Sequence, residues 1–116
     1  MTQSVYLIGH PVGHSLSPTF QNAAFRALGL PYVYLTLDHP VFCFDTLLQR
    51  LRDPTTLGAN VTLPHKERAL MLVDKRTDLA SQVGAVNTIF RDLSTGQLVG
   101  DNTDVVGLRD DLARLA

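Results

Sequence analysis

A chain of 116 residues, 45% of them hydrophobic, has the size of one domain and enough apolar side chains for one core. Its 11 acidic and 10 basic residues give a net charge of -1, without a basic block to follow a phosphate backbone, so nucleic acid is not expected as a partner. The single cysteine, Cys43, excludes an intrachain disulfide, and no signal-like segment or long apolar run occurs. We therefore expect a cytoplasmic protein that does not enter a membrane.

The first third of the sequence predicts a strand, a loop, a helix and a second strand. Residues 4–8 (SVYLI) are mostly apolar, β-branched or aromatic and are closed by Gly9, which is typical of a buried strand. Ser17 and Pro18 fit the N-cap and first position of a helix that Gly29 would end. Residues 32–37 predict the next strand. The apolar residues of the helix fall on one face: Phe20, Ala23, Ala24, Ala27 and Leu28.

The middle of the sequence predicts a second helix, a third strand and a third helix. Asp38 and Pro40 are predicted to open the second helix, which ends before Pro54 and carries apolar residues at spacings of three and four, namely Val41, Phe44, Leu47, Leu48 and Leu51. Residues 58–62 predict the third strand. Pro64 suits the first position of the following helix, which places Lys66 in its first turn.

The last third predicts a short helix, a hairpin and a final helix. Residues 77–83 suggest one or two helical turns, and residues 85–91 and 97–99 suggest two strands around a turn. From Asn102 onward an amphipathic helix is predicted by Val105, Leu108, Leu112 and Leu115. This helix reaches Ala116 without a glycine cap or a proline stop, so we expect a truncated or separated domain.

This alternation of strands and helices predicts the fold class. We expect an α/β domain over residues 1–116, with three α-β-α layers and a mainly parallel sheet that contains one antiparallel strand. Ligands of such sheets bind beyond the carboxyl ends of the strands. Four polar segments follow predicted strands and are expected to converge there: 15–17, 62–66, 87–88 and 101–104.

The polar residues of these segments suggest an anion site and a proton-transfer pair. Ser15 and Ser17 flank a helix start, where free N–H groups favour a carboxylate or phosphate, although the two serines also suit a turn and an N-cap. Lys66 stands at the unfavourable end of a helix dipole, so it is either solvated or required. With Asp104, which also suits a helix cap, Lys66 could transfer a proton and stabilise an alkoxide. Asn87 needs a buried partner or a ligand hydroxyl.

Metal and nucleotide sites are not expected. His10 and His14 have no third ligand at a suitable spacing. Residues 101–104 lack the glycine and the closing glutamate of a calcium loop. Gly9 and Gly13 do not have the spacing of a dinucleotide-binding turn.

Four stretches resemble, in order, the signature sequences of the substrate-binding domain of the shikimate dehydrogenases: 9–18 (GHPVGHSLSP), 60–66 (NVTLPHK), 84–88 (GAVNT) and 100–104 (GDNTD). The resemblance implies reversible, NADP-dependent reduction of 3-dehydroshikimate to shikimate in aromatic amino-acid biosynthesis. It implies that Lys66 and Asp104 form the catalytic pair. It also implies the substrate contacts, with the carboxylate on Ser15 and Ser17 and the ring hydroxyls on Thr62, Asn87 and Asp104.

The sequence departs from this family in one large respect. Members of the family continue into a Rossmann domain that binds NADP and adds a glutamine to the substrate site, and neither is found here. Hydride transfer needs nicotinamide held against the substrate, so we expect little or no dehydrogenase activity from the chain alone unless that domain is supplied in cis or in trans.

Other readings of the sequence stay open beside the enzyme half. One is a free-standing module that binds shikimate or a related cyclohexene carboxylate, and another is a dehydrogenase half that also takes quinate. A homodimer is compatible with the sequence. Phe20, Phe25 and Tyr34 suit either its surface or, more economically, the core.

Overall fold

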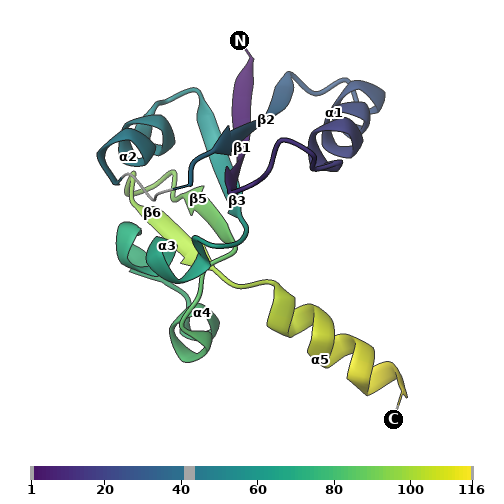
Figure 1. Ribbon diagram of the computed structural model, residues 1–116, viewed down its shortest axis with the longest axis vertical. Coiled ribbons are helices and arrows are strands. Elements are labelled where there is room, and N and C mark those ends of the chain that lie inside the picture. Colours follow the sequence, from purple (N-terminus) through teal and green to yellow (C-terminus); the bar gives the residue numbers. More distant parts are fainter. Residues whose placement is uncertain (1, 41–43, 116) are drawn as a thin grey trace.

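The computed structural model describes residues 2–40 and 44–115, which form one mixed sheet flanked by helices (Figure 1). The sheet has six strands in the order β2-β1-β3-β5-β6-β4. The strands are β1 (Gln3–Gly9), β2 (Tyr32–Asp38), β3 (Thr56–Val61), β4 (Lys75–Arg76), β5 (Thr88–Arg91) and β6 (Leu98–Asp101). The helices are α1 (Ser17–Ala27), α2 (Phe44–Arg52), α3 (Lys66–Leu72), α4 (Asp78–Val83) and α5 (Asp104–Leu115).

The strand directions bring the loops of interest to one edge of the sheet. β1 is parallel to both β2 and β3, and β4 is parallel to β6. β5 is antiparallel to both of its neighbours, β3 and β6. The carboxyl ends of β1, β2, β3 and β6 therefore meet at the same edge as the start of β5. The predicted fold, mainly parallel with one antiparallel strand, is confirmed.

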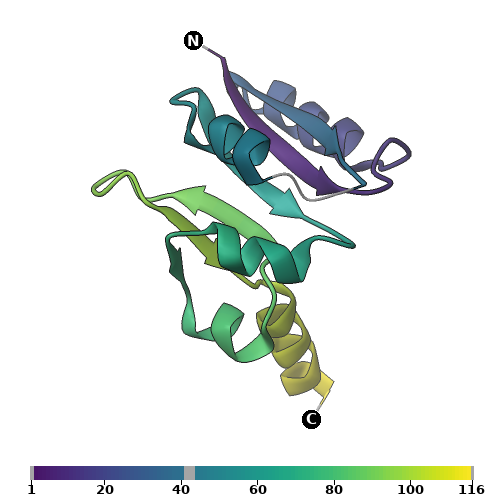
Figure 2. The same ribbon diagram turned by 60° about the vertical axis from the view of Figure 1, so that its left-hand side comes forward.

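Helices cover both faces of the sheet, and the alternation of β1 explains why (Figure 2). Tyr6 and Ile8 point into the larger core, which is built with side chains from α2, α3, β5 and β6, among them Leu47, Leu51, Ala69, Leu72, Ile89 and Leu98. Val5 and Leu7 point to the opposite face, where they pack with Phe25 of α1 and with Val12 and Tyr34. Because successive side chains of a strand alternate, one strand contributes to both layers.

The rotation of α1 differs from the prediction. Its predicted apolar face is exposed, with Phe20 and Leu28 at 68% and 71% of their full accessibility. The helix turns Asn22 toward β2 instead, where the amide accepts the Tyr34 N–H at 2.7 Å and donates to the Tyr34 carbonyl at 3.0 Å. Because β2 is an edge strand, its outer backbone groups have no partner strand. The two bonds from Asn22 satisfy such groups at Tyr34 and so stabilise this rotation of α1. The economical assignment to the core fits Phe25 and Tyr34 but was wrong for Phe20.

The predicted N-terminal ends of α2 and α3 were also wrong. Asp38 ends β2 rather than opening α2, and Leu47 and Leu51 of that helix are buried as predicted. The predicted helical residue Val41 lies outside the described residues. The third helix begins at Lys66 and not at Pro64, because the first helical hydrogen bond runs from the Ala69 N–H to the His65 carbonyl at 2.9 Å.

The last helix, α5, extends away from the sheet (Figure 1). Leu108 and Leu112 of this helix are exposed. Among the described helices, none combines the length and the apolar character needed to cross a membrane.

Candidate functional site

Lys66 and Asp104 form an ion pair at the edge where the strands end. The Lys66 Nζ lies 3.2 Å from Asp104 Oδ2, although the two residues are 38 positions apart. The side chains are 29% and 63% exposed, so the pair is reachable by a ligand. The carboxylate sits in the first turn of α5, where the helix dipole favours a negative charge. This carboxylate compensates the unfavourable position of the lysine that the sequence indicated.

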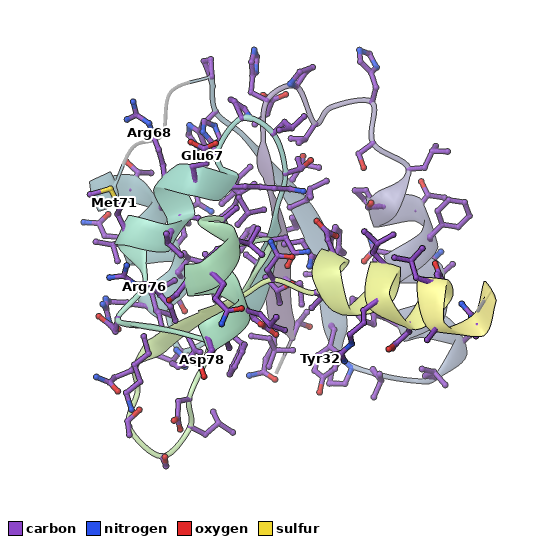
Figure 3. All side chains as sticks on the ribbon, turned by 90° about the horizontal axis from the view of Figure 1, so that it is seen from below. Tyr32, Glu67, Arg68, Met71, Arg76 and Asp78 are labelled. Atoms are coloured by element: carbon purple, nitrogen blue, oxygen red, sulfur yellow. The ribbon has the colours of Figure 1, made fainter. Side chains whose placement is uncertain are left out.

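Lys66 is set apart from its helical neighbours by its direction. Glu67, Arg68 and Met71 of α3 are exposed and point away from the rest of the protein (Figure 3). The backbone of Lys66 is held by the segment before β5, because the Lys66 carbonyl accepts the Val86 N–H at 2.8 Å. Lys66 is therefore the cation of this helix that the fold directs to the site.

The residue before Lys66 fixes the start of α3. His65 is buried, and its Nε2 donates a hydrogen bond of 2.5 Å to the backbone carbonyl of His39. The His65 N–H donates to the Thr62 carbonyl at 3.1 Å, which closes the turn that follows β3. The position of the lysine thus depends on contacts with the end of β2.

Asn102 fixes the start of α5, a role that was not predicted from the sequence. It is only 3% exposed, its Oδ1 accepts the Asp104 N–H at 3.0 Å, and its Nδ2 donates to the Ala85 carbonyl at 3.2 Å. The helix cap is therefore Asn102, and Asp104 is left to contact Lys66. The preference of asparagine for positions just before helices was the available signal.

Asn87 reaches the site by a different route from the predicted one. It does not follow a strand; it precedes β5, and the antiparallel direction of that strand returns it to the common edge. Its side chain is buried and binds the next loop, with Nδ2 donating to Thr103 Oγ1 and Oδ1 accepting the Thr103 N–H, each at 3.0 Å. Oδ1 also accepts the Thr88 hydroxyl. The group that this amide can still offer to a ligand is its second N–H.

Ser15 and Ser17 lie at the start of α1 with roles other than those expected from capping. The N-cap position is Leu16, which makes no side-chain cap. Ser15 Oγ instead accepts the Ser17 N–H at 3.1 Å. The Ser15 hydroxyl proton therefore remains available to a carboxylate acceptor.

Thr62 lies where the loops after β1 and β3 come together. Its N–H donates to the Ile8 carbonyl at 2.8 Å, and the His10 N–H donates to the Leu63 carbonyl at 3.0 Å. Gly9 permits this approach, because a Cβ on it would lie 2.9 Å from the Leu63 oxygen. Within the described residues, no hydrogen bond joins Ser15, Ser17 or Thr62 to the Lys66–Asp104 pair. All five residues lie at the same edge of the sheet.

Asp38 is a further charged residue at this edge, and it is not among the site residues predicted from the sequence. Its Oδ1 accepts a hydrogen bond from His10 Nδ1 at 2.6 Å, and its Oδ2 accepts the Val12 N–H at 3.2 Å. These bonds, the one from His10 foremost, lower the pKa of the Asp38 carboxyl. Its place at the end of a predicted parallel strand was a signal that could have identified it.

The described residues contain no group of three or more His, Cys, Asp or Glu side chains arranged to hold a metal ion. The chemistry that the described residues offer at this edge is that of hydrogen-bond donors, the Lys66 ammonium, the carboxylates of Asp104 and Asp38, and the imidazole of His10.

Comparison with known proteins relates this chain to one family. The family model described as the shikimate dehydrogenase substrate binding domain matches residues 7–89. The shikimate dehydrogenase (NADP(+)) of Rubrobacter xylanophilus is 50% identical over 106 residues, which cover 91% of this chain and 37% of that enzyme.

Solved structures agree with this match. The shikimate 5-dehydrogenase of Listeria monocytogenes, in complex with shikimate and NAD, aligns with a TM-score of 0.86 at 38% identity over 98% of this chain and 39% of its own. The Thermus thermophilus enzyme, in complex with NADP(H) and shikimate, gives 0.83 at 37% identity over 97% and 42%. The chain thus spans less than half the length of each of these relatives.

Proposed function

The chain belongs to the shikimate dehydrogenase substrate-binding domain family, and on this basis we propose that it binds shikimate or 3-dehydroshikimate. In the NADP-dependent shikimate dehydrogenase reaction it would transfer the proton to or from the substrate oxygen. The observation that carries the proposal is the ion pair between Lys66 and Asp104, 3.2 Å apart at the edge where the loops meet. Each residue begins a helix whose first turn is tied to neighbouring loops, so the pair is held before any substrate arrives.

The pair can serve the interconversion of a ring ketone and a ring alcohol. The Lys66 ammonium donates a hydrogen bond to the substrate oxygen, stabilises the negative charge that develops there and delivers its proton. Asp104 lies within hydrogen-bond distance of that ammonium, so it can orient the lysine and take part in its reprotonation. In the direction of shikimate oxidation the same two groups accept the proton of the alcohol.

The other residues of the edge would hold and orient the substrate. The Ser15 and Ser17 hydroxyls donate to the carboxylate near the positive end of α1. Thr62 and the second N–H of Asn87 meet ring hydroxyls, and Asp104 accepts from another. These contacts differ in kind, so they favour one orientation of an asymmetric ring.

The cofactor would be bound by residues outside this sequence. NADP supplies the hydride when it is bound. The loop after β1 does not have the glycine spacing of a dinucleotide-binding site. The first residues of this loop are also occupied by their hydrogen bonds to Asp38. We accordingly expect no measurable NADP-dependent oxidation of shikimate by the 116-residue chain alone.

A ligand titration tests the proposal directly. Shikimate is added to the isotopically labelled chain and the backbone amide shifts are followed. Saturable changes confined to residues 15–17, 62–66, 87–88 and 102–104 are expected. Changes elsewhere, or none at millimolar shikimate, would overturn the assignment of the site. Quinate, added in the same way, determines whether the site accepts a further ring hydroxyl.

A further inference from the structure

The loop that carries Ser15 is held from the side by the last residue of β2. Asp38 uses both carboxylate oxygens for this purpose, one for His10 Nδ1 at 2.6 Å and one for the Val12 N–H at 3.2 Å. Gly9 and Asp38 are paired in the register of β1 and β2, so the loop leaves β1 next to this carboxylate. The contact therefore constrains the loop from its first residues.

The constraint continues from Val12 to the start of α1. The Val12 carbonyl accepts the Ser15 N–H at 3.1 Å, and Ser15 Oγ accepts the Ser17 N–H at 3.1 Å. The Val12 side chain is buried and packs with Leu7 and Tyr34, which anchors the middle of the loop. A continuous series of contacts thus joins Asp38 to both serines.

The end of β2, which carries Asp38, is held in place by further hydrogen bonds. The next residue, His39, donates its N–H to the Gly9 carbonyl at 3.1 Å and accepts the hydrogen bond from His65 through its own carbonyl. The end of β2 consequently contacts both the serine loop and the turn before Lys66. A shift of this strand end would move both parts of the site.

The exposure of the hydrogen-bonded His10–Asp38 pair indicates that its effect is local. The side chains of His10 and Asp38 are 46% and 38% exposed, and polar contacts with this much solvent contribute little to global stability. The energy of such a contact can still order a loop, because a loop has few other contacts to lose. We therefore expect the His10–Asp38 contact to affect the conformation of the loop more than the global stability.

We propose that Asp38 is a positioning residue, which holds the loop between β1 and α1 so that Ser15 and Ser17 can receive the substrate carboxylate. This inference rests on the proposed function for the identity of the ligand. It assigns to the site a residue that is not expected to touch the substrate.

Two variants and one control of the full 116-residue chain test the proposal. Asp38→Ala removes both acceptors, whereas Asp38→Asn keeps an oxygen for the Val12 N–H. The control is Asp92→Ala, which removes another turn-forming carboxylate, bonded to Ser94 in the β5–β6 turn. Unaltered exchange of the sheet amides verifies that each variant is folded.

The first measurement is amide hydrogen exchange without ligand. Exchange at Ser15 and Ser17, whose N–H groups do not bond to Asp38, is expected to be about tenfold faster in Asp38→Ala, less affected in Asp38→Asn and unchanged in Asp92→Ala. Unchanged exchange at both serines in Asp38→Ala would overturn the proposal.

The second measurement compares the binding of shikimate with that of its methyl ester. Asp38→Ala is expected to weaken shikimate about tenfold and the ester much less, because only the acid uses the charged contact. Equal losses for both ligands would show a general structural effect and contradict the proposal. If the wild-type chain binds neither ligand, the proposed function fails, and the exchange data alone decide whether Asp38 orders the loop.

Discussion

Asn102 holds Asp104 in place without taking part in its ion pair. The Asn102 Oδ1 accepts the Asp104 N–H at 3.0 Å, while its Nδ2 donates to the Ala85 carbonyl at 3.2 Å. The buried amide therefore joins the start of α5 to the segment before β5. The carboxylate of Asp104 is left pointing to Lys66.

The first prediction concerns this amide. Asn102→Ala removes the helix cap and leaves the Ala85 carbonyl without its donor, so the free energy of unfolding is expected to fall by about 2 kcal/mol. Urea denaturation measures the change. Asn102→Ser retains a capping oxygen and should recover part of the loss. A loss below about 0.5 kcal/mol in the alanine variant would mean that the cap is dispensable.

The second prediction concerns Lys66. In a polypeptide that joins this chain to the nucleotide-binding part of a relative, Lys66→Ala is expected to lower turnover at least about a hundredfold, the lower range for losing a general acid or base. Arg68→Ala is the matched control, since Arg68 is exposed on the outer side of α3 (Figure 3). Steady-state rates of shikimate oxidation measure both. Equal rates in the two variants would assign Lys66 to the surface.

The third prediction concerns Asn87. Its Oδ1 already accepts from Thr88 and Thr103, so we expect it to serve the substrate as a donor. Asn87→Asp keeps the acceptors and removes the N–H groups, and it should weaken shikimate binding at least about tenfold. Calorimetric titration measures the affinity. Undiminished binding would exclude the donor role.

The fourth prediction concerns the pH dependence of stability. Hydrogen bonds lower the pKa of Asp38, Asp53, Asp74 and Asp92; at Asp74 the backbone N–H of Leu98 is the largest cause and Arg52 the next. A carboxyl whose pKa is lower in the folded protein favours folding once it is ionised, above about pH 4. This stabilisation is lost as the pH falls through the lowered folded values.

Melting temperatures between pH 6 and pH 3 provide the measurement for this fourth prediction. A fall at the acid end is expected, and Asp74→Asn should make the fall less steep because one of the four groups no longer titrates. A melting temperature that stays constant or rises toward pH 3 would contradict the prediction.

Local patterns were sufficient for five of the six strands, all but the two-residue β4, and for most helices. The apolar run of residues 4–8 became β1, and the spacing of Leu47 and Leu51 matched the buried face of α2. These predictions succeeded because the burial of a strand or a helix face follows the period of its own side chains. The single antiparallel strand was also predictable from the short turn that forms its hairpin with β6.

Predictions that depended on distant partners were less successful. The exposed face of α1 has the better apolar pattern, but the edge of β2 required Asn22. Asp38 looked like the start of a helix because the sequence does not reveal that His10 and Val12 lie beside it.

The sequence by itself determined the order of the elements apart from β4, and it identified the four polar segments at one edge of the sheet. Three of these segments were identified for the right reason, since they follow strands whose direction comes from the alternation of elements. Only the tertiary structure decided which partner each polar group has. It paired Lys66 with Asp104 across 38 positions and gave the capping role to Asn102. The physical reason is that hydrogen bonds and ion pairs act over a few ångströms, so they depend on packing between segments that are remote along the chain.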